Sequence, residues 1–536
     1  MDLTQEVRAW IADDPDSKSA AQLQHWLDTN DEVELRASFS GFLQFGTAGL
    51  RGPIRPGPSG MNRAVVGRAA AGIAAYMKER NLTSVVIGRD ARYGSEDFTF
   101  ETAEIMSGAG MKVFVLPRPL PTPVLAFATN ELRCDVGIMV TASHNPPQDN
   151  GYKVYLGGTV DGIHYRGSQI VSPTDELIAS KIAAINSLKS QPRGKEWTVL
   201  GEEVIHKYIG ITAGIAKRPG NLKIVYTAMH GVGTETLAHV FHKAGFPQPI
   251  LVDAQAKPDP DFPTVAFPNP EEPGAIDLAL ETARAFDADL VIANDPDADR
   301  CAAAIKDPIK GWRMMRGDEL GVVLGESIAR TTSQGILANS IVSSSILRKI
   351  AAHYHLDFKE TLTGFKWLAK IDGLTFGYEE ALGYAVDAIT VNDKDGISAA
   401  IKLAQIATDL ARENKTILDL LDEVWERHGF HATEQISIRL SDLSQVGLIM
   451  GKLRSNSPHE IAGYKVTSID DLSLPSDGLP PTDGLRIWLD GAIRIIIRPS
   501  GTEAKMKCYI EAIAKDSESA QIILDKLRAP LKELLT

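Results

Sequence analysis

The stretch VGIMVTASHNPPQDNGYKVY, residues 136–155, contains two apolar runs that flank a polar segment with two prolines. Short apolar runs bounded by turn residues are typical of buried strands, so we expect strands over 136–140 and 152–155. Ser143 then follows the carboxyl end of a strand, which is the edge of an open α/β sheet where ligands bind. A capped turn is the alternative role for this serine, because serine and asparagine often cap helices and form turns.

The same alternation of apolar runs and helical patterns continues on both sides of this stretch and restarts twice further along the chain. Strands that alternate with helices indicate an α/β fold with largely parallel or mixed sheets. From about residue 431, strand patterns follow one another and a helix pattern over 517–535 closes the chain, which favours a smaller C-terminal α+β domain. The expected domains are three α/β domains over 1–205, 206–315 and 316–430, and the α+β domain over 431–536.

Composition narrows the class of protein. The 536 residues are 44% hydrophobic and 23% charged, which is typical of a folded soluble chain. A net charge of −13 argues against nucleic acid or an anionic membrane as the main partner. The N-terminus has no apolar signal region, and nowhere do about 18 apolar residues follow one another. The three cysteines are far apart, so we expect reduced, buried thiols in a cytoplasmic protein.

An acidic motif, NDPDADRC over 294–301, follows the apolar run that ends at residue 293. In an extended segment, Asp295, Asp297 and Asp299 would project to one side, where three like charges require a cation. Oxygen ligands favour Mg²⁺ over zinc. Arg300 beside the cluster suits an anion that shares the metal. The alternative is an acidic turn with Pro296 at its bend.

Phosphate is the anion that unites these observations. FGTAGLRG over 45–52 and RPSGTEAKMK over 498–507 combine glycine, hydroxyl and cation, which suits phosphate oxygens. His144 and Lys153 could handle the Ser143 proton or stabilise an anion. No G-x-S-x-G or Walker motif occurs, and HGVGTE over 230–235 lacks the third glycine of a dinucleotide fingerprint. Sugar hydroxyls and phosphate could be bound by Lys366, Lys394, Glu379 and Glu380. Solvated surface charge is the alternative explanation for these four residues.

Taken in order, GTAGLRG, TASHNPPQDNGYK, DPDADR, GYEEALG and RPSGTE resemble the motifs of the α-D-phosphohexomutase superfamily, which includes phosphoglucomutases and phosphomannomutases. The similarity spans residues 45–507, and the wording of several motifs is similar to the branch with phosphoglucomutase-2-like and phosphopentomutase proteins. The resemblance implies three related α/β domains and a smaller fourth domain around a central cleft. It also implies Mg²⁺ as cofactor, a sugar bisphosphate as activator and a sugar phosphate as the small-molecule partner.

The resemblance also assigns residues. Ser143 would carry a phosphoryl group and, with Asp295, Asp297 and Asp299, would hold Mg²⁺. The catalytic neighbourhood would contain Arg51, His144, Lys153, Arg300 and Lys394, of which Lys153 and Lys394 are candidates for proton transfer. The substrate ligands would be Thr363, Gly364, Glu379 and Glu380, together with a distal phosphate clamp of Arg498, Ser500, Gly501 and Thr502. Ala381 stands where many members have a serine that shares the sugar contact.

The resulting hypothesis is a phosphosugar mutase that interconverts hexose 1-phosphate and hexose 6-phosphate of glucose or mannose, as a monomer or homodimer. The intermediate would be a sugar bisphosphate. A phosphopentomutase and a non-catalytic sugar-phosphate-binding protein of the same fold are alternatives. The aspartate cluster alone would also suit a phosphatase with an aspartate nucleophile, but the serine motif would then be unexplained.

Overall fold

The computed structural model describes residues 2–46, 48–474, 478–499 and 505–536. They form two compact units. The first contains Met1–Met315, Ala369–Asp372 and Ala381–Arg412, and the second contains Arg316–Leu368, Gly373–Glu380 and Glu413–Thr536. In the described part of the chain, no helix combines the length and apolar character that a membrane span requires.

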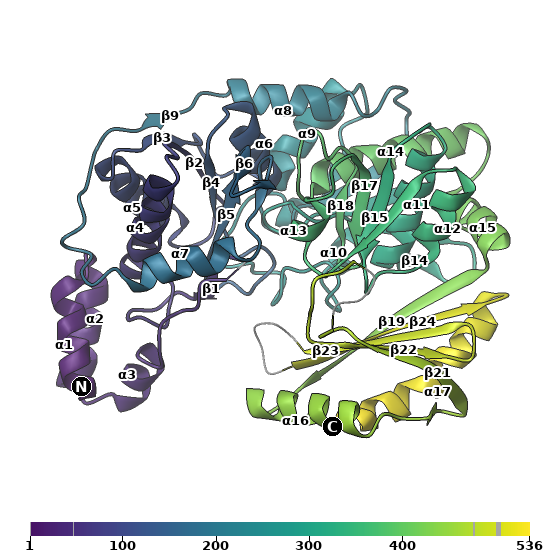
Figure 1. Ribbon diagram of the computed structural model, residues 1–536. Helices are drawn as coiled ribbons and strands as arrows, with labels where there is room; N and C mark the ends of the chain where they lie inside the picture. Colours follow the sequence, from purple (N-terminus) through teal and green to yellow (C-terminus); the bar gives the residue numbers. More distant parts are fainter. Residues whose placement is uncertain (1, 47, 475–477, 500–504) are drawn as a thin grey trace. The chain divides into compact units, whose positions relative to one another are not determined.

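The first unit contains two large sheets and a two-stranded pair, β6 (Thr159–Val160) with β7 (Ile163–His164). The first large sheet holds the strands on both sides of Ser143, β4 (Val136–Val140) and β5 (Asp149–Leu156) (Figure 1). Its central strands, β2 (Ser84–Arg89), β3 (Lys112–Val115) and β4, are parallel. At one edge, β5 pairs antiparallel with β4, and β1 (Leu50–Pro53) pairs antiparallel with β5. β9 (Thr198–Val199) pairs in parallel with β3 at the other edge. The predicted strands at 136–140 and 152–155 are therefore confirmed.

Helices surround this sheet. α5 (Ser95–Gly108) and α6 (Thr122–Glu131) pack on its strands, and α4 (Arg63–Glu79) packs on α5 and α7 (Thr174–Ala183). Nearly every apolar residue of α4 and β4 is buried, which is the behaviour expected of elements covered on both sides. The N-terminal helices are α1 (Leu3–Asp13), α2 (Ser17–Asp28) and α3 (Glu32–Ser38).

The second sheet of the first unit has the order β11-β10-β12-β13-β14. β10 (Ile224–Thr227) lies in parallel between β11 (Ile250–Leu251) and β12 (Leu290–Ala293), whereas β13 (Ala302–Asp307) and β14 (Gly311–Met314) are antiparallel. The helices of this part are α8 (Glu203–Ala213), α9 (Gly233–Lys243), α10 (Asp277–Ala285) and α14 (Gly396–Arg412). β18 (Gly383–Ala385) approaches Arg300 through a single bridge at Gly383.

The second unit begins with a third α/β arrangement. β15 (Ile336–Ser340) pairs in parallel with β16 (Asp357–Thr361) and β17 (Leu374–Glu379). Its helices are α11 (Gly317–Ala329), α12 (Ile346–His353), α13 (Phe365–Leu368) and α15 (Ile417–His428).

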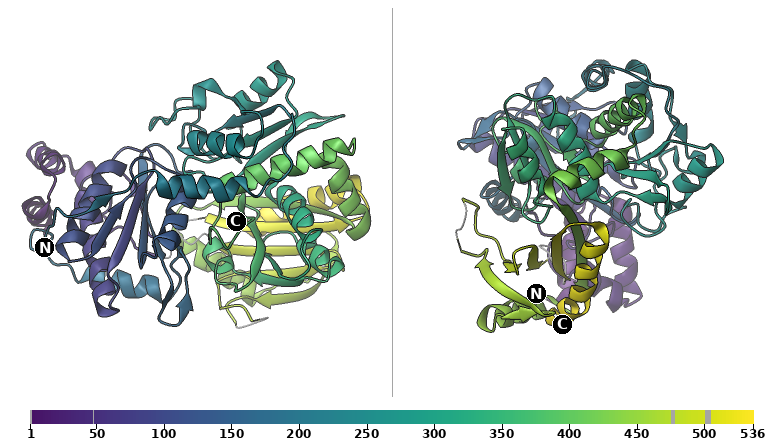
Figure 2. Two further views of the ribbon diagram at one scale, coloured as in Figure 1. Left: turned by 90° about the horizontal axis from the view of Figure 1, so that it is seen from above. Right: turned by 90° about the vertical axis from the view of Figure 1, so that its right-hand side faces the viewer.

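The C-terminal part of the second unit is an antiparallel sheet with helices on one face (Figures 1 and 2). Its strands, in spatial order, are β19 (Phe430–Arg439), β24 (Lys505–Ala514), β23 (Ile493–Pro499), β22 (Leu485–Leu489), β21 (Tyr464–Asp471) and β20 (Glu460–Ile461). α16 (Leu443–Ser455) and α17 (Ser517–Leu534) pack on it and share its core. The predicted α/β class with mixed sheets, the C-terminal α+β region and the closing helix are confirmed.

Candidate active site

Ser143 lies in the turn that follows β4 and is nearly fully buried. Its φ of 52° is left-handed, a conformation that a serine adopts at some energetic cost. The backbone N–H of Ser143 donates to Thr141 Oγ1 at 2.9 Å, which holds the turn. The side-chain Oγ donates to Asp295 Oδ2 at 2.7 Å and lies 3.2 Å from His144 Nδ1. The turn therefore directs the Ser143 hydroxyl toward Asp295 and His144.

Arg92, which was not among the predicted site residues, organises this turn. Its guanidinium is buried and donates to the carbonyl oxygens of Ser143, Asn145, Pro146 and Asp149, at 2.6 to 3.2 Å. Asp90 lies 3.4 Å away, and the ring of Phe262 lies under the guanidinium at 4.8 Å. Five N–H donors in one rigid plane allow an arginine to hold several carbonyls at once. The available signal was a charged R-D-A-R motif directly after the apolar run over 84–88.

The acidic motif forms a turn after β12, not the extended segment that we expected. Ala298 has a φ of 53°, and Val232 N–H donates to the Pro296 carbonyl at 2.8 Å. The carboxylates of Asp295, Asp297 and Asp299 nevertheless converge, with one oxygen of each within 4.8 Å of the others, and all three are buried. A tight turn brings alternate side chains together as effectively as a strand would.

Cations and donors from other elements surround the three carboxylates. Lys153 Nζ, on β5, lies 2.7 Å from Asp297 Oδ2 and 2.9 Å from Asp299 Oδ2. Lys394 Nζ lies 3.4 Å from Asp299. Thr122, at the start of α6, donates to Asp297 at 2.6 Å, and the Arg300 backbone N–H donates to Asp295 at 3.0 Å.

The pKa values of the aspartates follow from these contacts. Burial, together with Asp297 and Asp299, raises the pKa of Asp295 well above its usual range. Burial alone would also raise the pKa values of Asp297 and Asp299, but Lys153 and the other donors and cations around them together outweigh it, and both pKa values are lowered.

The arrangement fits a divalent cation. Asp297 Oδ1 and Asp299 Oδ1 are buried, and neither has a hydrogen-bond partner among the described residues. An orphaned buried carboxylate oxygen is costly unless a cation or another donor satisfies it. Together with Asp295, these two residues place three buried carboxylate oxygens within 4.8 Å of one another, which makes a candidate metal centre of the hard, oxygen-only type.

Two arginines and a histidine complete the group around Ser143. Arg51, on β1, donates to Asn145 Oδ1 at 3.1 Å. Burial, and then the charges of Arg300 and Arg51, lowers the pKa of His144 well below its usual value. Arg300 Nη1 lies 3.9 Å from Glu271. The structure therefore brings all six predicted catalytic residues and the three aspartates into one unit.

The predicted sugar ligands form a second group, in the second unit. Gly364, with a φ of 110°, donates its N–H to Glu379 Oε1 at 2.6 Å, and Thr363 precedes it in the chain. Glu380 Oε2 accepts from Ser343 at 2.9 Å and from Ser340 at 3.1 Å. Burial, Glu379 and Asp318 raise the pKa of Glu380 to about 7.

The phosphate clamp is described only in part. Arg498 lies at the end of β23. Burial and Glu380 raise the pKa of Tyr509, and the charge of Arg498 acts in the opposite direction. Ser500, Gly501 and Thr502 lie outside the described residues, as does Thr47 of the first glycine-rich motif.

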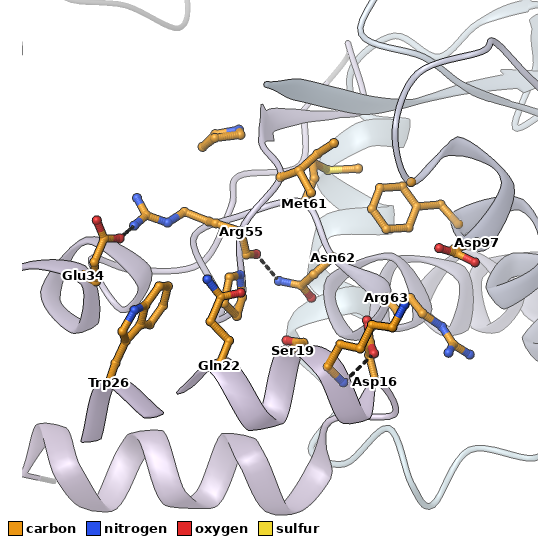
Figure 3. Close-up of a pocket in the computed structure, with 16 residues that line it drawn as sticks. Asp16, Ser19, Gln22, Trp26, Glu34, Arg55, Met61, Asn62, Arg63 and Asp97 are labelled. Carbon is orange, nitrogen blue, oxygen red and sulfur yellow. Dashed lines mark hydrogen bonds and ion pairs between the residues drawn. The ribbon is translucent and has the colours of Figure 1, made fainter. Parts of the chain in front are cut away.

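A separate cavity of about 640 Å³ lies in the first unit, among α2, α3 and the starts of α4 and α5 (Figure 3). Three carboxylates and three cations line it, and Arg55 pairs with Glu34 at 2.6 Å. None of the predicted site residues lines this cavity, and its balanced charge gives it no preference for an anion.

Comparisons with known proteins show the family to which the chain belongs. Three consecutive domain families match the chain: phosphoglucomutase/phosphomannomutase alpha/beta/alpha domain I over residues 43–187, domain II over 205–311 and domain III over 316–428. The chain is 48% identical to "Probable phosphomannomutase" of Haemophilus influenzae, over 89% of this chain and 98% of that protein. It is 32% identical to the phosphoglucomutase of Staphylococcus aureus, over 95% of both chains, and 31% identical to mouse phosphopentomutase, over 99% and 94%.

Solved structures share the fold. A phosphoglucomutase/phosphomannomutase family protein from Burkholderia thailandensis superposes with a TM-score of 0.70 at 20% identity, over 90% of this chain and 96% of that chain. The open form of parafusin, a phosphoglucomutase from Paramecium, gives a TM-score of 0.70 at 18% identity, over 93% and 95%. With three consecutive domain matches and relatives of this similarity along nearly the whole chain, the protein belongs to the phosphoglucomutase/phosphomannomutase family and is a phosphosugar mutase.

Proposed function

We propose that this mutase interconverts hexose 1-phosphate and hexose 6-phosphate of glucose or mannose, with Ser143 as the phosphoryl carrier. The observation that carries the proposal is the hydroxyl of Ser143, which a strained and buried turn holds 2.7 Å from Asp295 of the candidate metal centre. Phosphoryl transfer depends mainly on positioning and on stabilising charge, and this arrangement supplies both.

Each half-reaction transfers one phosphoryl group and one proton between Ser143 and the sugar phosphate. The P–O bond of phosphoserine 143 breaks while a free hydroxyl of the sugar phosphate forms a new O–P bond. The sugar hydroxyl loses its proton and the Ser143 oxygen gains one, for which Lys153 and Lys394 are candidate carriers. The resulting sugar bisphosphate turns over and returns its other phosphate to Ser143.

The remaining residues have electrostatic and binding roles in this scheme. Mg²⁺ would be held by a phosphoserine oxygen and the carboxylates of Asp295, Asp297 and Asp299. When bound, it would supply positive charge beside the transferred phosphoryl group. Arg51, His144 and Arg300 would face the phosphoryl oxygens. The sugar and its distal phosphate would be held by Thr363, Gly364, Glu379, Glu380, Arg498, Ser500, Gly501 and Thr502.

The preference for a hexose is supported by the relatives named phosphomannomutase and phosphoglucomutase. A pentose 1- and 5-phosphate is the second candidate substrate, supported by the relatives named phosphopentomutase and by Ala381, which has no hydroxyl to share the sugar contact. We keep the domains 1–205, 206–315, 316–430 and 431–536, a sugar bisphosphate activator, a monomeric or homodimeric state and a cytoplasmic location as parts of the proposal.

A substrate panel tests the proposal. Glucose 1-phosphate, mannose 1-phosphate and deoxyribose 1-phosphate are assayed by kcat/KM, with and without Mg²⁺ and glucose 1,6-bisphosphate. We expect a hexose phosphate to give the highest value, and Ser143→Ala to abolish both turnover and covalent phosphate detected by intact mass. Ser180→Ala, an exposed serine of α7, is the matched control. Full activity of Ser143→Ala would overturn the carrier role, and a preference for the pentose would overturn the hexose assignment.

A further inference from the structure

A second cavity, of about 890 Å³, lies in the second unit and contains none of the residues assigned to the reaction. Of the described residues, five cationic side chains and one carboxylate, that of Glu360, line it; the cations are Arg348, Lys349, Lys359, Arg486 and Arg494. This size is within the range of small-molecule sites.

The carboxylate of Glu360 lies within ion-pair distance of three of these cations. Glu360 lies 3.5 Å from Arg348 and 3.6 Å from both Arg486 and Arg494. These separations exceed the usual length of a charge-assisted hydrogen bond, so Glu360 is placed between the guanidinium groups and forms a short pair with none of them. Lys359 is exposed and has no ion pair with the described residues, so its charge adds to the excess.

The excess persists when the neighbouring carboxylates are counted. Asp470 pairs with Arg486 at 2.9 Å, and Glu511 pairs with Arg494 at 3.0 Å. Among the described residues, these two and Glu360 place three carboxylates against five cations, in a chain whose net charge is −13. The cavity among the N-terminal helices, by contrast, has three charges of each sign. The positive charge is therefore a local feature of this cavity.

Aromatic side chains form part of the wall. Trp488 lies on β22 two residues from Arg486, on the same face of the sheet, and pairs directly with Arg494 across β23. Phe358, on β16, lies under the guanidinium of Arg348 at 4.9 Å. A ring with a phosphate attached could stack on this wall while its phosphate meets the cations, because planar groups and arginines stack on aromatic rings.

The cavity also adjoins the loop after β15. Arg494 donates to the carbonyl oxygens of Ile341 and Ser343, and the hydroxyl of Ser343 donates to Glu380. Only a short loop therefore separates the wall of the cavity from the proposed sugar ligands.

We propose that this cavity is a binding site for a phosphorylated small molecule, distinct from the site of phosphoryl transfer. The phosphate would be held chiefly by the exposed Arg348 and Lys359, and the buried Arg486 and Arg494 would add positive charge to the wall. The ligand chemistry is a phosphate dianion, which a nucleoside monophosphate or inorganic pyrophosphate could supply.

Calorimetric titration tests the site in the full-length protein. AMP and pyrophosphate are titrated separately, without Mg²⁺ and with excess glucose 1-phosphate. We expect at least one of them to bind, and the double variant Arg348→Gln/Lys359→Gln to weaken that binding about tenfold or more, because charge-assisted contacts are removed. Both substituted residues are exposed, so the variant should fold and keep kcat/KM within about twofold. If AMP binds and pyrophosphate does not, the adenine ring contributes to the affinity.

Lys515→Gln is the matched control. Lys515 is an exposed lysine of the same unit that does not line the cavity, and its substitution should leave both titrations unchanged. The proposal is overturned if neither probe binds the wild-type protein, or if the double variant binds as tightly as Lys515→Gln. Either result leaves the mutase assay with Ser143→Ala unaffected, so the two proposals fail separately.

Discussion

The hydroxyl of Ser143 donates to Asp295 at 2.7 Å, although 152 residues separate the two in the chain. Ser143 follows β4 of the first sheet, and Asp295 follows β12 of the second. Each residue lies at the carboxyl end of a strand, so the two large sheets of the first unit meet at their ligand-binding edges. The turn interpretation of the serine motif and its chemical interpretation are therefore compatible, because the turn is what directs the hydroxyl to the aspartates.

Mg²⁺ should stabilise the folded protein through the three aspartates. A ligand at 100 times its Kd adds about 2.7 kcal/mol if it binds only the folded state. We expect Mg²⁺ to raise the Tm of the wild-type protein and Asp299→Asn to lose most of that shift. Asp287→Asn, an exposed aspartate paired with Lys306 at 3.3 Å, should keep it. Equal shifts in the two variants, measured by differential scanning calorimetry, would contradict the metal centre.

Arg92→Lys should impair catalysis without contact to the substrate. An ammonium has three donors on one atom and cannot hold four carbonyls spread along the turn. A misplaced hydroxyl of Ser143 should lower kcat roughly 100-fold. Because Arg92 positions the turn and does not bind the sugar, KM should change little.

Arg89→Lys is the control for this substitution, since Arg89 pairs with the exposed Glu96 at 2.7 Å. Steady-state kinetics of the two variants provide the comparison. A loss that falls on KM and spares kcat would argue against a positioning role for Arg92.

Gly231→Ala should displace the aspartate turn. A Cβ at Gly231 would lie 2.3 Å from the backbone Cα and O of Pro296, which stands between Asp295 and Asp297. The backbone must shift, so we expect a lower Tm and a weaker stabilisation by Mg²⁺. Gly447→Ala, on α16 with no atom within 4 Å of the new Cβ, should instead stabilise by about 0.5–1 kcal/mol. If both substitutions shift Tm in the same direction, the close approach at Gly231 is not what constrains the turn.

Glu380 should make stability depend on pH. Its pKa in the folded state is about 7, against an ordinary value of 4.5, owing to burial, Glu379 and Asp318. The folded state therefore binds the proton more tightly. The resulting stabilisation, about 3 kcal/mol, is fully present below pH 4.5 and is lost as the pH rises through 7.

Glu380→Gln removes this dependence. Relative to the wild-type protein, the variant should gain stability between pH 5 and pH 8, measured as the difference in Tm at each pH. Glu518→Gln, an exposed position in the first turn of α17, should give a difference that does not vary over the same range. A constant difference for Glu380→Gln as well would mean that its carboxyl titrates at its ordinary pKa.

Local patterns were sufficient to predict the strands around Ser143, the α/β class, the C-terminal sheet and the closing helix, because apolar periodicity and turn residues act over a few positions. The aspartate motif indicated a cation because its three like charges are neighbours in the sequence and need a cation in any conformation that brings them together. The expected conformation of that motif was wrong: the residues form a turn, and the backbone hydrogen bond from Val232 to Pro296 that holds it comes from a distant segment.

The contacts that complete the site depend on the tertiary structure. Lys153 neutralises Asp297 across 144 residues, and Arg92 gathers carbonyls more than 50 residues away. The basic cavity likewise combines β16 and α12 with β22 and β23. Side-chain periodicity specifies which face of an element is buried, but it does not specify which other element covers that face. The sequence by itself thus identified the serine, the acidic motif and the fold class, whereas long-range packing decided how charges and donors are brought to them.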